Sequence, residues 1–87
     1  MDSPHESTFE LVYDDERRAR VVERSVAREV DDMVDDRSRA RVDRDGATVT
    51  VHVVASDLTA LRAAQNTWLT LVAVAEEAVD AAERYGA

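Results

Sequence analysis

The residues that could carry out chemistry are few and scattered along the chain of 87 residues. His5 lies near the N-terminus and His52 stands alone in an alternating segment, and neither pairs with a serine and an aspartate as in a catalytic triad. The absence of cysteine excludes disulfides, thiolate metal ligands and cysteine nucleophiles. Gly46 and Gly86 are too far apart for a phosphate-binding loop or a G-x-x-G clamp. We therefore expect no enzymatic activity, no metal site and no cofactor.

The net charge of the chain is −8, from 19 acidic and 11 basic residues, and every basic residue is arginine. At molar salt the Debye length is about 3 Å, so crowded carboxylates no longer repel one another. The composition therefore indicates adaptation to high salt, and GC-rich codon usage is an alternative source of the same bias. A chain this acidic does not favour direct binding to nucleic acid.

No segment of the sequence is typical of a membrane or secreted protein. The longest nearly apolar run, Trp68–Ala75, is far shorter than the ~20 residues that cross a bilayer. The N-terminus lacks the basic and apolar regions of a signal peptide. We therefore expect a cytoplasmic protein without membrane contacts, with a disordered tail over residues 1–6 and a single domain over residues 7–86.

The hydrophobic pattern predicts three strands and two helices. Alternation of polar and apolar residues indicates strands over 7–13, 38–43 and 47–55, the last two joined by a tight turn ending at Gly46. Apolar residues three or four positions apart predict a helix from 14–16 to about Val34, with Glu16/Arg20 and Arg28/Asp32 pairs on its outer side. A second helix of about 28 residues is predicted from Ser56 or Asp57 to Arg84 or Tyr85. Its core stripe is predicted to be Leu58, Leu61, Trp68, Val72, Ala75 and Val79.

This order of elements, β-α-β-β-α, predicts an α+β fold. A right-handed crossover leaves a slot that the third strand fills, giving a three-stranded antiparallel sheet of order 1-3-2 with both helices on one face. The first strand is then a free edge, and a free edge has to be covered, charged or paired. We expect Phe9, Leu11 and Val12 to lie at a homodimer interface formed by this edge or by the second helix.

The second helix is more apolar than one small sheet requires. A core helix explains its first stripe, and a second stripe about 100° away favours a partner helix. The partner-binding residues predicted from this surplus are Thr67, Leu71, Val74 and Ala78, with Val21 and Ala27 on the first helix.

The start of this helix carries a motif, D-x-x-x-L-R-x-x-x-N, formed by Asp57, Leu61, Arg62 and Asn66. With the preceding valine-rich strand and the order and length of the elements, the chain resembles the small Pcc subunit of the KEOPS complex, in the Pcc/LAGE family. Thr67 departs from the serine that is usual there. The likeness together with the composition predicts a halophilic archaeal source. Asp57 is also an expected N-cap, and Arg62 and Asn66 suit either a solvated face or a subunit contact.

The resemblance implies a non-catalytic scaffold in the complex that makes threonylcarbamoyladenosine in tRNA. It implies a homodimer whose subunit packs its two helices against a helical hairpin of the catalytic Kae subunit. The chain is either the main subunit of such a homodimer or a paralogue that replaces one protomer in a heterodimer. An autonomous RNA-binding α+β module is the alternative, and a small ligand-binding or enzymatic domain is a weaker one. The predicted tRNA contacts are Arg39, Arg41 and His52 on the open sheet face, with Arg37 and Arg44 nearby; ion pairs with Glu10 and Asp43 are the alternative role of these arginines.

Overall fold

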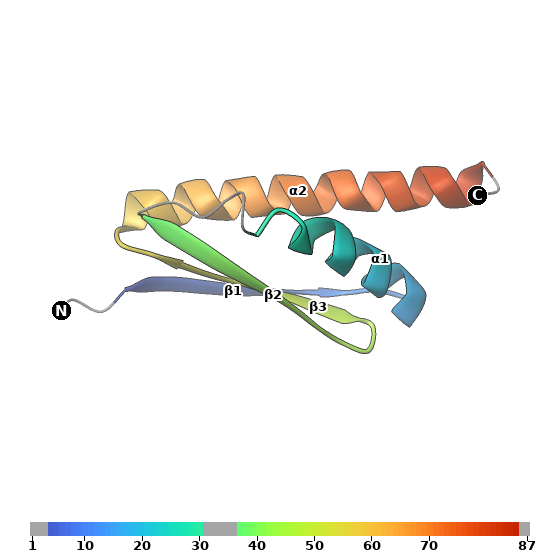
Figure 1. Ribbon diagram of the computed structural model, residues 1–87, viewed down its shortest axis with the longest axis horizontal. Coiled ribbons are helices and arrows are strands. Elements are labelled where there is room, and N and C mark those ends of the chain that lie inside the picture. The colour runs from blue at the N-terminus through green and yellow to red at the C-terminus, as the bar shows by residue number, and fades with distance from the viewer. Residues whose placement is uncertain (1–3, 31–36, 86–87) are drawn as a thin grey trace.

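Three strands and two helices form two layers in the computed structural model, which describes residues 4–30 and 37–85. The strands pair antiparallel in the order β1-β3-β2, and both helices cover the same face of the sheet (Figure 1). The predicted α+β fold and its topology are confirmed. The elements are β1 (His5–Val12), α1 (Glu16–Ala27), β2 (Ser38–Asp45), β3 (Thr48–Ala55) and α2 (Leu58–Arg84).

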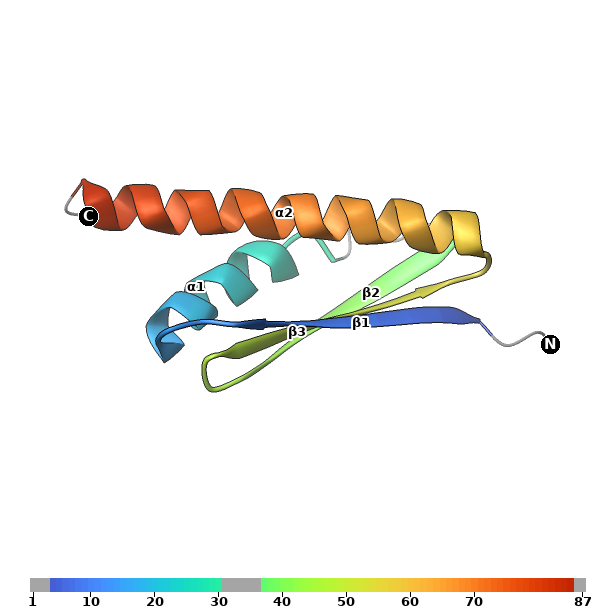
Figure 2. The ribbon, with the colours of Figure 1, turned by 180° about the vertical axis from the view of Figure 1, so that it is seen from behind.

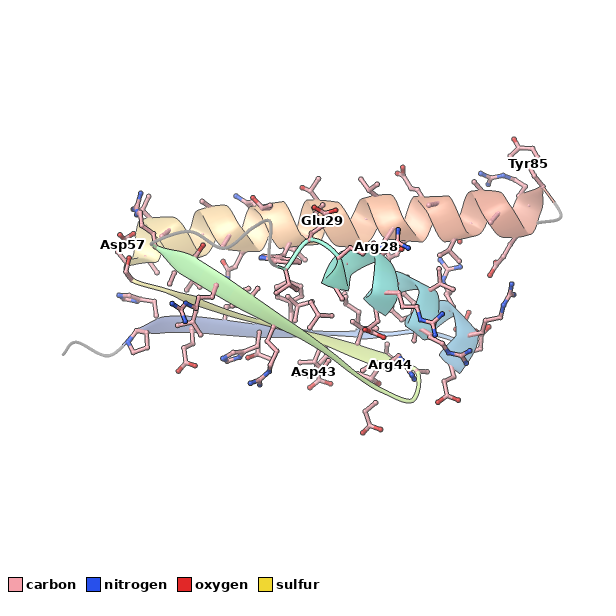
Figure 3. All side chains as sticks on the ribbon, viewed as in Figure 1. Arg28, Glu29, Asp43, Arg44, Asp57 and Tyr85 are labelled. Atoms are coloured by element: carbon pink, nitrogen blue, oxygen red, sulfur yellow. The ribbon has the colours of Figure 1, made fainter. Side chains whose placement is uncertain are left out.

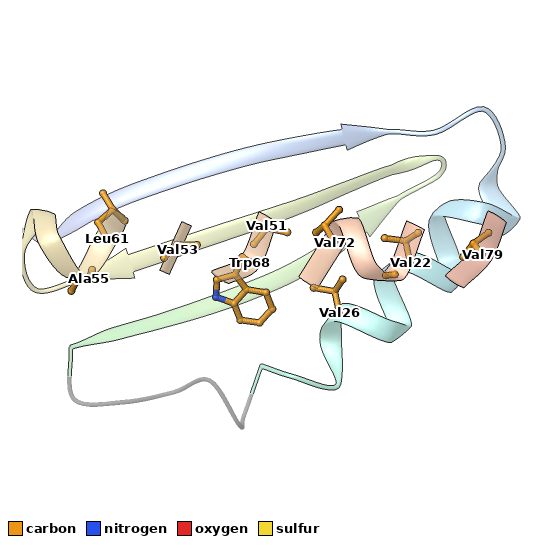
Figure 4. Packing of buried hydrophobic residues seen from close by; sticks show 11 residues of the cluster. Val22, Val26, Val51, Val53, Ala55, Leu61, Trp68, Val72 and Val79 are labelled. Carbon is orange, nitrogen blue, oxygen red and sulfur yellow. The ribbon is translucent and has the colours of Figure 1, made fainter. Parts of the chain in front are cut away.

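The core lies between the sheet and the helices, and every second side chain of each strand points into it. Val49, Val51 and Val53 of β3 are fully buried, as expected for the central strand. Trp68 of α2 packs between the strands and Val26 of α1, in the middle of the buried cluster (Figure 4). Phe9 and Leu11 of β1 are half-buried against the same cluster, on the face that the sequence predicts.

The hairpin between β2 and β3 is tighter than predicted. Asp45 pairs with Thr48, so the loop contains only Gly46 and Ala47, and β2 runs two residues beyond its predicted end. Gly46 has a φ of 61°, and no other described residue has a positive φ. A two-residue loop with positive φ at its first position alone is the type II′ turn, whose twist matches that of the strands.

Helix α1 is shorter than predicted. The side chain of Asp15 caps it by accepting a hydrogen bond of 2.7 Å from the backbone N–H of Arg18. The prediction of a helix to Val34 is wrong over 28–30, because the N–H groups of Glu29 and Val30 donate to carbonyls three residues back, as in a turn. Residues 31–34 lie outside the described chain, and apolar spacing alone led the prediction across this end.

Helix α2 confirms the predicted bounds within a residue or two, with Asp57 as its N-cap and Tyr85 as its C-cap. The predicted core stripe is buried from Leu61 onward, but Leu58 is 47% exposed, so its place in the core was wrong. Leu58 is three positions before Leu61 and therefore about 60° away around the helix, at the first turn. No helix in the described part of the chain is both long and apolar enough to span a bilayer.

The central position of Trp68 gives a first prediction. Trp68→Ala should lower the free energy of unfolding by about 3–5 kcal/mol, because a large buried ring leaves a cavity. Leu69→Ala is the matched control on the exposed neighbouring position and should change it by less than ~1 kcal/mol. Denaturant unfolding at molar salt measures both, and equal effects would contradict this packing.

Candidate protein-interaction surfaces

One side of α2 is exposed and carries no charge. From Ala63 to Ala75 the sequence has no charged residue, although 34% of the chain is charged. Leu69 is 48% exposed and Val74 is 59% exposed. This surface, called the uncharged face here, lies opposite the stripe that packs on the sheet. Its exposed members are Ala63, Asn66, Leu69, Thr70, Ala73 and Val74.

The predicted partner stripe on α2 overlaps this face only in part. Val74 and Ala78 are exposed, whereas Thr67 and Leu71 are half-buried. Leu71 packs against the core cluster, so much of its surface is already used inside the domain. Thr67 and Leu71 line a shallow hollow with Asn66 and Thr70. The hydroxyls of both threonines donate to carbonyls four residues back, which leaves their methyl groups as the free apolar surface.

The two residues predicted on α1 do not form a row. Val21 is 40% exposed and lines a hollow between the helices, and Ala27 is half-buried. They are six positions apart and thus about 120° apart around the helix, on different sides of it. Leu69 and Ala73 were missed by the sequence reasoning, which followed only the two stripes next to the core. Absence of charge over a whole segment was the signal that could have found them.

Asp57, the first residue of the motif that ends at Asn66, has a structural role at the start of α2. Asp57 accepts a hydrogen bond of 2.7 Å from the N–H of Ala60, which confirms its role as N-cap. It also accepts from Arg37, whose Nη2 lies 3.0 Å from Oδ2 (Figure 3). The bond from Ala60, followed by that from Arg37, lowers the pKa of Asp57. Leu61 is buried, Arg62 is exposed beside the uncharged face, and Asn66 belongs to that face.

The far half of α2 is held by two polar side chains, one directly after β1 and one in the first turn of α1. The Tyr13 hydroxyl donates to Glu76 over 2.7 Å, and burial, followed by this bond, raises the pKa of Tyr13. Arg18 forms ion pairs with Asp80 at 2.6 Å and Glu83 at 3.7 Å. We call these contacts the Tyr13–Arg18 clamp. The clamp fixes the part of α2 that lies above α1 (Figure 1).

The predicted tRNA contacts do lie together on the open sheet face, but they are not a basic patch. Arg39 pairs across the sheet with Val54, and Arg41 with His52, so all three predicted side chains share one face. Arg41 binds Asp43 at 2.9 Å, as the alternative role anticipated. His52 contacts Glu6 at 3.0 Å on one ring nitrogen and Thr8 at 2.6 Å on the other. Four carboxylates share the face with the two arginines, those of Glu6, Glu10, Asp43 and Asp45.

Arg44 was predicted near this cluster, and that prediction is wrong. Consecutive side chains of a strand point to opposite faces of the sheet. Asp43 is on the open face, so Arg44, which follows it, is on the helix side (Figure 3). There its guanidinium lies 3.5 Å from Glu16 and 3.7 Å from Glu23, and it donates to the Gly46 carbonyl at 3.1 Å.

The outer edge of β1 has no strand beside it in the described chain. β1 pairs with β3 on one side only, and it lies in front of the other strands in Figure 2. Phe9 and Leu11 face the core, whereas Val12 faces outward and is 76% exposed. β1 begins at His5, two residues earlier than predicted, so Glu6 adds a carboxylate to the single one expected at Glu10. The opposite edge, β2, carries five charged residues and is less suited to pairing.

Comparison with known proteins places these surfaces in context. Residues 6–80, from β1 to most of α2, match the model of a family described as "Transcription factor Pcc1". The fold is similar to that of a chain in a structure described as the binary Gon7–Pcc1 complex. The TM-score is 0.71, with 16% identity over 88% of this chain and 94% of that chain, which shows likeness of fold alone. No protein of curated function is significantly similar in sequence.

The cap at Asp57 gives a prediction for pH. Its pKa is lowered on folding, so its contribution to stability is complete above its ordinary pKa of 3.8 and is lost as pH falls through the lower folded value. Asp57→Asn keeps a capping oxygen but loses the charge that Arg37 contacts. The melting temperatures of the two proteins should differ at neutral pH and converge as pH falls through the lowered pKa of Asp57. A difference that persists at low pH would mean that the Asp57 charge does not act as described.

Proposed function

This chain belongs to the Pcc1 family, and we propose that it is a non-catalytic subunit of KEOPS, the complex that makes threonylcarbamoyladenosine in tRNA. In this role it binds the catalytic Kae subunit and pairs with a second copy of itself, and it meets tRNA indirectly or weakly. Family membership and the motif from Asp57 to Asn66 support the proposal. We further propose that it works in the cytoplasm of a halophilic archaeon, as the lysine-free acidic composition suggests.

The observation that carries the proposal is the uncharged face of α2. Leu69 and Val74 leave large apolar side chains in water on a helix that already buries its opposite side. A helical hairpin of the catalytic subunit placed along this face would remove them from water and complete a four-helix arrangement with crossing angles of roughly 20°. Because the face is small, affinity should depend on a few anchors.

Val74→Asp tests this contact. It buries an unpaired carboxylate in the proposed interface, which costs several kcal/mol, so capture of the catalytic subunit should be lost. The fold should be retained, because Val74 is 59% exposed in the free chain. Thr59→Asp adds the same charge at an exposed position of α2 outside the face and should leave capture intact. Unchanged capture by Val74→Asp would place the docking surface elsewhere.

The free edge of β1 supports the proposed homodimer. If two copies paired through β1, the backbone N–H and C=O groups at its outer edge would form hydrogen bonds with the second copy. Leu11 and Val12, replaced together by proline, should abolish the dimer, because proline removes the N–H groups that pairing needs. Sedimentation at molar salt and tens of micromolar protein measures the change, with circular dichroism as the check on folding. A monomeric wild-type chain under these conditions would overturn the proposal of a dimer.

Direct nucleic-acid binding is the alternative function, and the description of the family as a transcription factor points toward it. The net charge of −8 and the four carboxylates on the open sheet face disfavour it. The arginines of that face are set among acids rather than arranged to meet a phosphate backbone. We therefore place tRNA recognition mainly in the partners of this chain.

A further inference from the structure

The solvent side of α1 carries a row of four arginines. They follow one another at intervals of three, four and four positions, and such spacing aligns side chains along one side of a helix. Ala19, Val22 and Val26 bury the opposite side. Arg28 has helical backbone angles at the C-cap, so the row spans about 16 Å at 1.5 Å per residue. This arginine row consists of Arg17, Arg20, Arg24 and Arg28.

Two carboxylates of α1 that are close to the row in sequence contact an arginine outside it. Glu16 is four positions before Arg20 and was expected to pair with it, but its carboxylate contacts Arg44, as does that of Glu23. Among the described residues, arginine ion pairs involve only Arg18, Arg37, Arg41 and Arg44. The four arginines of the row therefore form no ion pair with another described residue, on a strongly acidic chain. Asp32, which was expected to pair with Arg28, lies outside the described residues.

An apolar hollow adjoins the row. It has a volume of about 70 Å³ and lies between α1 and the last turns of α2, with Val21, Val79 and Ala82 as apolar lining. Arg17 and Arg18 border it from the α1 side, and Glu83 from α2. The surface therefore offers one small apolar socket next to a line of cations spaced by about one helical turn.

We infer that this surface binds an acidic helix of a partner protein. A helix lying alongside α1 repeats with the same pitch, so carboxylates at intervals of three or four residues would meet successive arginines. An adjacent aliphatic side chain of the same helix would enter the hollow, as charged and apolar positions alternate in helix pairs. The inference rests on the proposed function, since it makes the acidic helix part of the catalytic subunit and adds a charged contact to the uncharged face.

Charge on either side of the row favours a helix over a nucleic acid. Asp14, Asp15 and Glu16 are exposed directly before Arg17, and five more acidic residues occur in the sequence between Arg28 and Arg37. A long polyanion that extended past Arg17 would meet the carboxylates of Asp14, Asp15 and Glu16. An acidic helix of three turns matches the length of the row. Arginine also suits this partner, because its planar guanidinium binds carboxylates in a bidentate manner.

Charge reversal in the row tests the inference. Arg20→Glu with Arg24→Glu is compared with Arg39→Glu with Arg41→Glu, which makes the same charge change on the open sheet face. Affinity for the purified catalytic subunit is measured by calorimetry from about 0.2 M to about 2 M KCl, with circular dichroism confirming the fold at each salt. At the lowest salt the affinity of the row variant should be at least about tenfold lower than that of wild type. The difference in affinity should decrease at higher salt, because salt screens the charged contact. The control should stay within about twofold of wild type.

The outcomes separate this inference from the proposed function. Wild-type affinity in the row variant overturns the inference while leaving the proposed function standing, and a wild-type chain that never binds the catalytic subunit overturns the function itself. Filter binding of tRNA to the isolated chain is the second measurement. A row variant that loses tRNA binding but keeps affinity for the catalytic subunit would make the row a nucleic-acid site and overturn the inference.

Discussion

The fold depends on one constraint, the burial of a 27-residue helix against a sheet of only three strands. The stripe from Ala60 to Val79 packs on the sheet and on α1, and Trp68 fills the centre of this contact. Because both helices lie in a single layer, no other described element covers the other side of α2. Its uncharged face is therefore a direct consequence of the architecture, and a partner is the natural means of removing it from water.

Polar contacts fix the two ends of this long helix. Asp57 and Arg37 join its start to the chain just before β2, and the Tyr13–Arg18 clamp joins its far half to the end of β1 and the first turn of α1. The contacts at both ends are partly exposed, so they stabilise the orientation of α2 more than they add to the free energy of folding. A helix held at both ends presents its exposed side as a rigid surface, which lowers the entropic cost of binding.

The distribution of charge follows from the same layout. Arg44 lies on the helix side of the sheet and draws Glu16 and Glu23 toward it, so carboxylates gather at the junction of α1 and β2. The outer side of α1 carries the arginine row, while the open sheet face mixes arginine with a larger number of acids. A chain with a net charge of −8 thus has a local surface of the opposite sign among its described residues, which pairwise spacing along the helix did not reveal.

The sequence by itself determined the elements, their order and the alternation of each strand, because these follow from local periodicity that tertiary contacts reinforce. It also identified the N-cap at Asp57 and the motif that indicates the family. The tertiary structure decided the end of α1, the two-residue turn at Gly46 and the direction of Arg44. It also decided which apolar residues of α2 remain in water. These features depend on strand register and on which neighbouring residue each side chain contacts. Both are set by residues distant in the sequence. Leu71 and Leu69 show the difference, since both are apolar residues of one helix and only the packed sheet distinguishes the half-buried from the exposed one.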